Sequence, residues 1–98
     1  MIPYIHLNHF TRKAYRQAVD DTLLNLADEK PAKVADALIA NPDLFRELEP
    51  DMAKAILLAL IDRGQADSLR QLLGLKATGR RKAALLAELL LKHAIRHQ

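Results

Sequence analysis

Apolar residues recur along most of the chain at the three- and four-residue spacing that is typical of α-helices. Prolines and glycines divide this pattern, because Pro favours the first turn of a helix and Gly favours its end. We therefore expect helices at about 11–29, 31–40, 51–63 and 78–95. Two further short helices are expected, one that carries Leu44, Phe45 and Leu48 and one that carries Leu69, Leu72 and Leu73. Thr11 is the expected N-cap of the first helix, and residues 1–10, which include Pro3, are expected to form an extended arm.

The segment at 51–63 is apolar on almost every side, so we expect it at the centre of the fold. Gly64 is expected to end this helix, because glycine adopts the left-handed conformation without steric cost. Gly74 is expected to end the next helix, with Leu75 folding back as the hydrophobic partner of a Schellman motif. The residues expected to point inward from that helix are Leu69, Leu72 and Leu73.

The composition agrees with an all-α fold. Half of the residues are hydrophobic, mostly Ala, Leu and Ile, whereas aromatic residues make up only 4%. Ala and Leu favour helices, while the aromatic residues that favour strands are scarce. At 98 residues the chain fits one domain. We predict a single helical domain over 1–98, a compact bundle of five or six short helices at 11–98 with the extended N-terminal arm at 1–10.

Three features that the sequence lacks narrow the function classes. There is no cysteine, which excludes a disulfide scaffold, a thiolate zinc site and a cysteine nucleophile. No uncharged apolar run approaches the roughly 20 residues that a membrane span needs. The first four residues also lack the basic start of a secretory signal. We therefore expect no interaction with membranes and a cytoplasmic location.

Charge is distributed unevenly along the chain. The net charge is +3, but residues 1–19 carry three bases and no acid, and residues 20–51 carry nine acids and three bases. Residues 52–98 then carry nine bases and three acids. An acidic middle between basic ends favours an oriented encounter with a charged partner, although the charges can equally be solvated surface.

The start of the last expected helix is strongly basic. Arg80, Arg81 and Lys82 fall in its first turn, where the helix dipole already disfavours cations. Free backbone amides and three cations at one place would suit phosphate or an acidic protein surface, and a solvated junction is the alternative. The residues predicted to contact such a partner are Lys76, Arg80, Arg81, Lys82, Lys92 and Arg96.

The same helix carries more leucine than a one-sided surface helix needs. Either it is buried between other helices, or part of it contacts a second chain, which can be a partner protein or a second copy. The residues predicted for such a docking or dimer face are Leu86, Leu90, Leu91 and Ile95.

Residues 68–85 resemble the SAP family of helix–extended–helix DNA-binding modules in three features. These are the Gly74-Leu75 turn, the second glycine at Gly79, and basic residues before a leucine-rich helix. The stretch departs from the family in its leucine spacing before Gly74 and in one extra residue before Leu85, so membership is not claimed. A helix-turn-helix is disfavoured, because Arg70 would occupy a position that needs a small residue.

Candidate chemistry is sparse. Ser68 is the only serine and has no histidine at local spacing, and the three glycines cannot form a phosphate-cradling loop. His93 and His97 have metal-compatible spacing but lack neighbouring ligands. We expect Asp43 and Asp51 to serve as caps and dipole partners at helix starts rather than to act as acid–base catalysts. The predicted protein has no catalytic, cofactor or metal site.

We therefore predict a small non-enzymatic regulator, inhibitor or adaptor that binds a larger protein partner. That partner can itself be a protein that acts on nucleic acid. The alternative is a regulator that binds DNA or RNA directly through the basic last helix. These two functions differ in salt dependence, because phosphate binding releases counterions and apolar docking does not.

Overall fold

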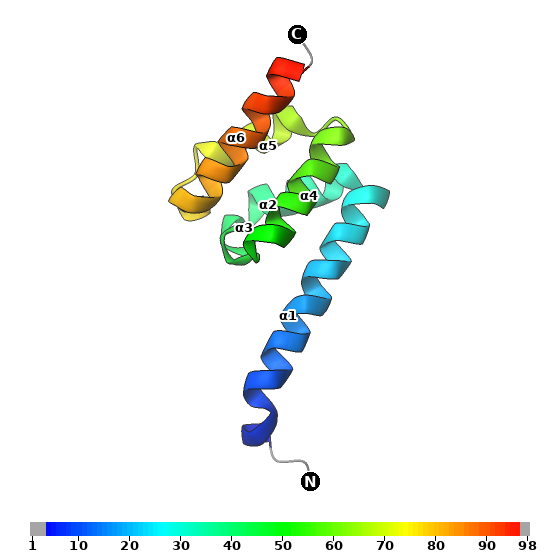
Figure 1. Ribbon diagram of the computed structural model, residues 1–98, viewed down its shortest axis with the longest axis vertical. Coiled ribbons are helices and arrows are strands. Elements are labelled where there is room, and N and C mark those ends of the chain that lie inside the picture. The colour runs from blue at the N-terminus through cyan, green and yellow to red at the C-terminus, as the bar shows by residue number, and fades with distance from the viewer. Residues whose placement is uncertain (1–3, 97–98) are drawn as a thin grey trace.

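Residues 4–96 form a bundle of six α-helices and one 3-10 turn (Figure 1). The computed structural model describes the backbone of residues 4–96 and the side chains of residues 14–96, and this part of the chain contains no strand. The all-α prediction is therefore confirmed. In chain order the elements are α1 (Tyr4–Glu29), α2 (Pro31–Ala40), α3 (Pro42–Glu47), α4 (Pro50–Asp62), α5 (Ala66–Leu73), η1 (Lys76–Thr78) and α6 (Arg80–Arg96).

The N-terminal segment differs from its expectation. Residues 4–10 belong to α1, a helix of 26 residues, so the extended arm is not confirmed and Thr11 is not an N-cap. Residues 1–3 lie outside the described residues. The physical reason is that helix propagation gains one hydrogen bond per added residue, and no Pro or Gly interrupts the chain between Tyr4 and Glu29. The N-terminal part of α1 extends away from the other helices (Figure 1).

Proline determines where three of the helices begin. Pro31, Pro42 and Pro50 each occupy the first position of a helix, where the missing amide hydrogen costs nothing. The helix boundaries predicted from these prolines are confirmed to within two residues.

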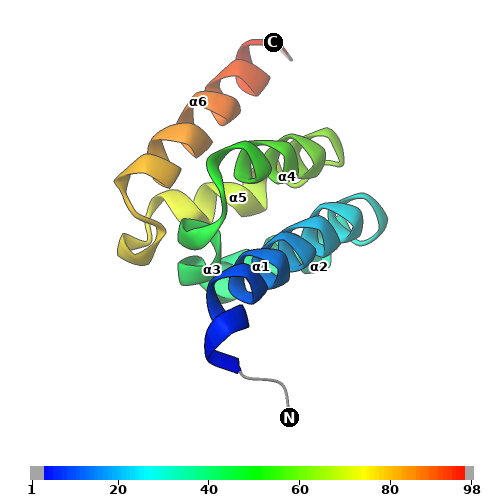
Figure 2. The same ribbon diagram turned by 60° about the horizontal axis from the view of Figure 1, so that its bottom comes forward.

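Helix α4 lies between its neighbours and packs against α1, α2 and α6, as the views in Figures 1 and 2 agree. Helix α5 packs against α2 and α6 and closes the bundle. The prediction that α4 lies at the centre is confirmed, although Leu58 points to solvent. The largest fully buried apolar side chains are Leu38, Phe45, Ile56, Leu57, Leu60, Leu69, Leu72 and Leu86.

The two glycine-terminated helices end differently. At Gly64, whose φ is 85°, the amides of Gly64 and Gln65 donate to the carbonyls of Ile61 and Leu60, which is a Schellman motif. Gly74 has a φ of −87°, and the amide of Leu75 donates to Leu72 in a tighter 3-10 pattern. The Schellman ending predicted at Gly74 is therefore wrong. Leu75 and Leu73, the latter expected to point inward, are both exposed.

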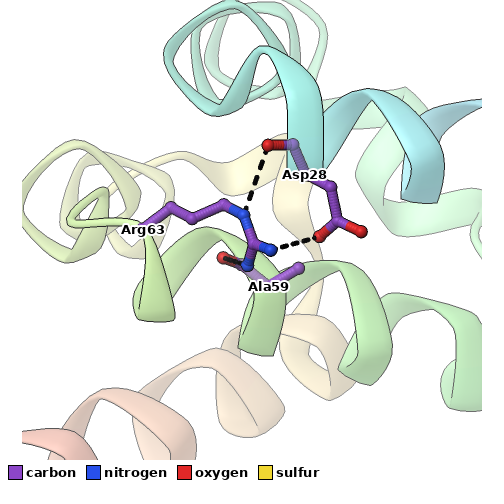
Figure 3. A network of polar contacts seen from close by, with 3 residues as sticks. All are labelled: Asp28, Ala59 and Arg63. Carbon is purple, nitrogen blue, oxygen red and sulfur yellow. Dashed lines mark hydrogen bonds and ion pairs between the residues drawn. The ribbon is translucent and has the colours of Figure 1, made fainter.

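The C-terminal ends of α1 and α4 are joined by Arg63 (Figure 3). A guanidinium nitrogen of Arg63 lies 2.9 Å from a carboxylate oxygen of Asp28, and its Nε donates to the Asp28 carbonyl at 3.3 Å. Its remaining nitrogen donates to the carbonyl of Ala59 at 3.2 Å. Because Arg63 also satisfies carbonyls near the C-terminal ends of two helices, the contact complements both helix dipoles.

Candidate functional site

A basic cleft lies where the turn between α3 and α4 meets the turn between η1 and α6. Its volume is about 610 Å³, within the range of about 300–1,000 Å³ that is usual for small-molecule sites. We call this the basic cleft and define it by its lining residues, which are Arg46, Pro50, Asp51, Lys54, Thr78, Gly79, Arg80, Arg81, Lys82 and Leu85.

Local hydrogen bonds determine where α6 begins beside the cleft. The buried hydroxyl of Thr78 donates to the carbonyl of Leu72 at 2.8 Å, which ties η1 back onto α5. Gly79 then turns the chain with φ 82° and ψ 155°, a conformation that only glycine adopts readily. A Cβ at Gly79 would lie 3.2 Å from the aliphatic carbons of Arg46, so this glycine also allows close approach to α3.

Lys82 forms the inner wall of the cleft. Its side chain is largely buried, and the residue is only 9% exposed. Its ammonium group donates to the backbone carbonyl of Arg46 at 3.1 Å. Burial lowers the pKa of Lys82 from its ordinary value, while the nearby Glu49 carboxylate raises it and Arg81 lowers it. The hydrogen bond of Lys82 therefore helps to hold α3 against α6.

The remaining bases of the cleft point outward. Lys54, Arg80 and Arg81 are exposed, and within residues 14–96 none has a carboxylate at ion-pair distance. Arg46 pairs with Asp43 at 3.2 Å. Asp51 is the one acid among the lining residues. The backbone amides of the first turn of α6 also lack intrahelical acceptors, so the cleft combines several donors and cations with little neutralising charge.

The structure separates the six basic residues that the sequence grouped. Arg80, Arg81 and Lys82 line the cleft, whereas Lys76 is exposed on η1 and does not line it. Lys92 lies about 18 Å from Arg80 along the axis of α6, given the helical rise per residue. It pairs with Glu88 at 3.2 Å. Arg96 is the last residue of α6. A single ligand of small size therefore contacts only part of the predicted set.

Two basic residues of the cleft were not predicted from the sequence. Arg46 lies in the acidic part of the chain and Lys54 lies in the most apolar helix, so neither stood out as part of a basic cluster. The packing of α3 on η1 brings Arg46 beside Arg80 and Arg81, and the packing of α4 on α6 brings Lys54 there. No local pattern signals this, because the residues are more than twenty positions apart.

The predicted apolar face of α6 needs a correction. Leu86 and Leu90 are buried in the core and cannot form a docking surface, because α6 packs against both α4 and α5. Leu91 and Ile95 are 61% and 62% exposed. Ala84 and Ala87 are exposed on the same side of the helix, at spacings of three and four residues. We call Ala84, Ala87, Leu91 and Ile95 the outward face of α6.

Other features relevant to function are few. Among the described side chains no group of three or more His, Asp or Glu is arranged to hold a metal ion. The side chain of His97 lies outside the described residues, so the pairing with His93 is untested. None of the helices in residues 4–96 is long and apolar enough to cross a membrane. Comparison with protein-family models, curated proteins and solved structures finds no match.

Proposed function

We propose that the protein is a non-enzymatic adaptor that binds a larger protein partner through the outward face of α6. The observation that supports this function is the exposure of Leu91 and Ile95 on a helix whose opposite side is already buried. Large apolar side chains that gather on one exposed face mark interaction sites more often than scattered ones do.

The geometry of the outward face suits a helix as the partner element. Its four residues follow one side of α6 over three turns, as the contact stripe of a packed helix pair does. Ala84 and Ala87 allow close approach of a second backbone, while Leu91 and Ile95 offer larger side chains for burial. Full burial of a leucine or isoleucine side chain contributes about 1.5–3 kcal/mol.

Charge beside this face selects the kind of helix. Arg81 and Arg96 border it, and Lys92 beside them is paired with Glu88, the one acid of α6, so the charge that remains on this border is positive. An amphipathic helix with acidic flanks would complement this border, whereas a second copy of α6 would place like charges together. We therefore propose an acid-flanked helix of a different protein as the occupant.

The test is capture of partners from a native lysate at low and at high salt, with and without nuclease. The proposal concerns the protein that is retained after nuclease treatment at high salt. The double variant Leu91→Glu/Ile95→Glu is compared with the wild type and with Tyr15→Glu, a control that introduces one of the two negative charges at an exposed site on α1. The proposal expects a discrete protein that the wild type and Tyr15→Glu retain and the double variant loses at least tenfold.

The captured protein must then bind in purified form through an acid-flanked helical segment. Equal capture by the double variant contradicts the proposal. Nucleic acid as the sole specific catch, or a homodimer in light scattering that the double variant disrupts, replaces it with another function.

A further inference from the structure

The basic cleft and the outward face of α6 are different surfaces, and the cleft has a chemistry of its own. Five bases from α3, α4 and α6 line it together with the single acid Asp51. The structure therefore concentrates positive charge from three elements at one concave place. Such concentration raises the local potential, because the protein walls screen charge less than water does.

The bases repel one another in the free protein. Burial is the main cause of the lowered pKa of Lys82, and the neighbouring Arg81 lowers it further, while Glu49 raises it. Lys54, Arg80 and Arg81 have no carboxylate partner among the described residues, in contrast to Arg63 and Arg70, which do. A polyanion in the cleft would relieve the repulsion and supply the missing partners.

We propose that the basic cleft binds phosphate groups through Lys54, Arg80 and Arg81. Guanidinium groups present donors in a fork that matches phosphate oxygens, and the ammonium of Lys54 supplies a third cation from the facing helix. Lys82 and the aliphatic part of Arg46 form the wall behind these groups. Aromatic side chains do not line the cleft. The cleft is therefore suited to bind phosphate groups rather than stacked nucleobases.

The phosphate can belong to a small molecule or to a nucleic-acid backbone, and two probes separate these sources. The first is pyrophosphate, titrated into the full-length protein by calorimetry at low salt. The second is a fluorescent 12-nucleotide single strand, followed by anisotropy over a series of salt concentrations. A site for small phosphates binds the first probe, and a site for the backbone binds the second with an affinity that falls with salt.

The test variant is Lys54→Ala/Arg80→Ala/Arg81→Ala. Its control is Lys33→Ala/Arg70→Ala/Lys92→Ala, which removes three bases outside the cleft and gives the same net charge. All substituted side chains are exposed, so both variants should fold, as thermal melting can verify. We expect the cleft variant to lose at least tenfold in affinity for the probe that binds, and the control less than threefold.

Three results overturn the proposal: neither probe binds, the cleft variant binds as the wild type does, or both variants lose affinity equally. The last result would show attraction by net charge alone. The outcome is independent of the adaptor function, because both probes carry phosphate and no protein partner is present. The cleft variant keeps the four residues of the outward face of α6 but removes Arg81 from its border. Conversely, the double variant Leu91→Glu/Ile95→Glu keeps Lys54, Arg80 and Arg81.

Discussion

Lys82, in the first turn of α6, donates a hydrogen bond of 3.1 Å from its ammonium group to the backbone carbonyl of Arg46 in α3. A cation is unfavourable at the start of a helix but favourable at the end of one, where the last carbonyls lack partners. The end of α3 therefore offsets the cost that Lys82 has at the start of α6. The basic cluster is in part a structural contact between these two helices.

Replacement of Lys82 by alanine is expected to destabilise the protein by about 1–3 kcal/mol, because the Arg46 carbonyl loses a charged hydrogen-bond partner. Arg81→Ala removes an exposed neighbour and is expected to change stability by less than about 0.5 kcal/mol. Urea denaturation of the two variants measures the difference. Equal midpoints would show that the Lys82 contact contributes nothing.

Alanine at Gly79 is expected to cost more stability than alanine at Gly64. Both glycines have positive φ, but the Gly64 position is open while a Cβ at Gly79 meets Arg46 at 3.2 Å. Gly64→Ala should cost about 1–2 kcal/mol for the left-handed backbone alone. Gly79→Ala adds the contact with α3 to a strain of about 1–3 kcal/mol. Thermal melting tests this order, and a smaller loss for Gly79→Ala would refute it.

Leu86→Ala and Leu91→Ala distinguish the buried and exposed sides of α6. Leu86 is fully buried, so its truncation leaves a cavity and is expected to cost about 2–5 kcal/mol. Leu91 is exposed, and its truncation should change stability by less than about 0.5 kcal/mol. Denaturant unfolding of the isolated protein gives both values. A large loss for Leu91→Ala would mean that this residue is covered in solution.

Asp20 is a buried carboxyl group, 4% exposed, on the side of α1 near the start of α4. Burial raises its pKa above the ordinary value. Arg16 lowers it, the carboxylates of Glu49 and Asp21 raise it, and a hydrogen bond with the Glu49 backbone lowers it. Because the folded pKa is higher than the unfolded one, the folded state binds the proton more tightly. The charged form therefore reduces stability at neutral pH.

Asp20→Asn is consequently expected to raise the melting temperature at pH 7, since Asn keeps an acceptor oxygen without the charge. The advantage should shrink as the pH falls through the raised pKa and disappear below about pH 4, where free carboxyl groups are protonated. Melting curves of both proteins from pH 7 to pH 3 measure it. An advantage that does not change with pH would contradict the raised pKa.

Most of the helical architecture could be predicted, because the signals that produce it are local. Pro31, Pro42 and Pro50 begin helices through their own ring geometry, and Gly64 ends one through its own backbone freedom. The start of α1 was missed, since the β-leaning residues near Tyr4 have weak propensities that propagation of an adjoining helix overrides.

The sequence by itself therefore determined the all-α class, most helix boundaries and the basic turn at Arg80 and Arg81. Only the tertiary structure decided which leucines of α6 are buried, because Leu86 and Leu91 differ in their neighbours and not in their type. It also decided the composition of the cleft. Arg46 and Lys54 join the bases of α6 through packing between distant segments, which no periodicity in the chain encodes.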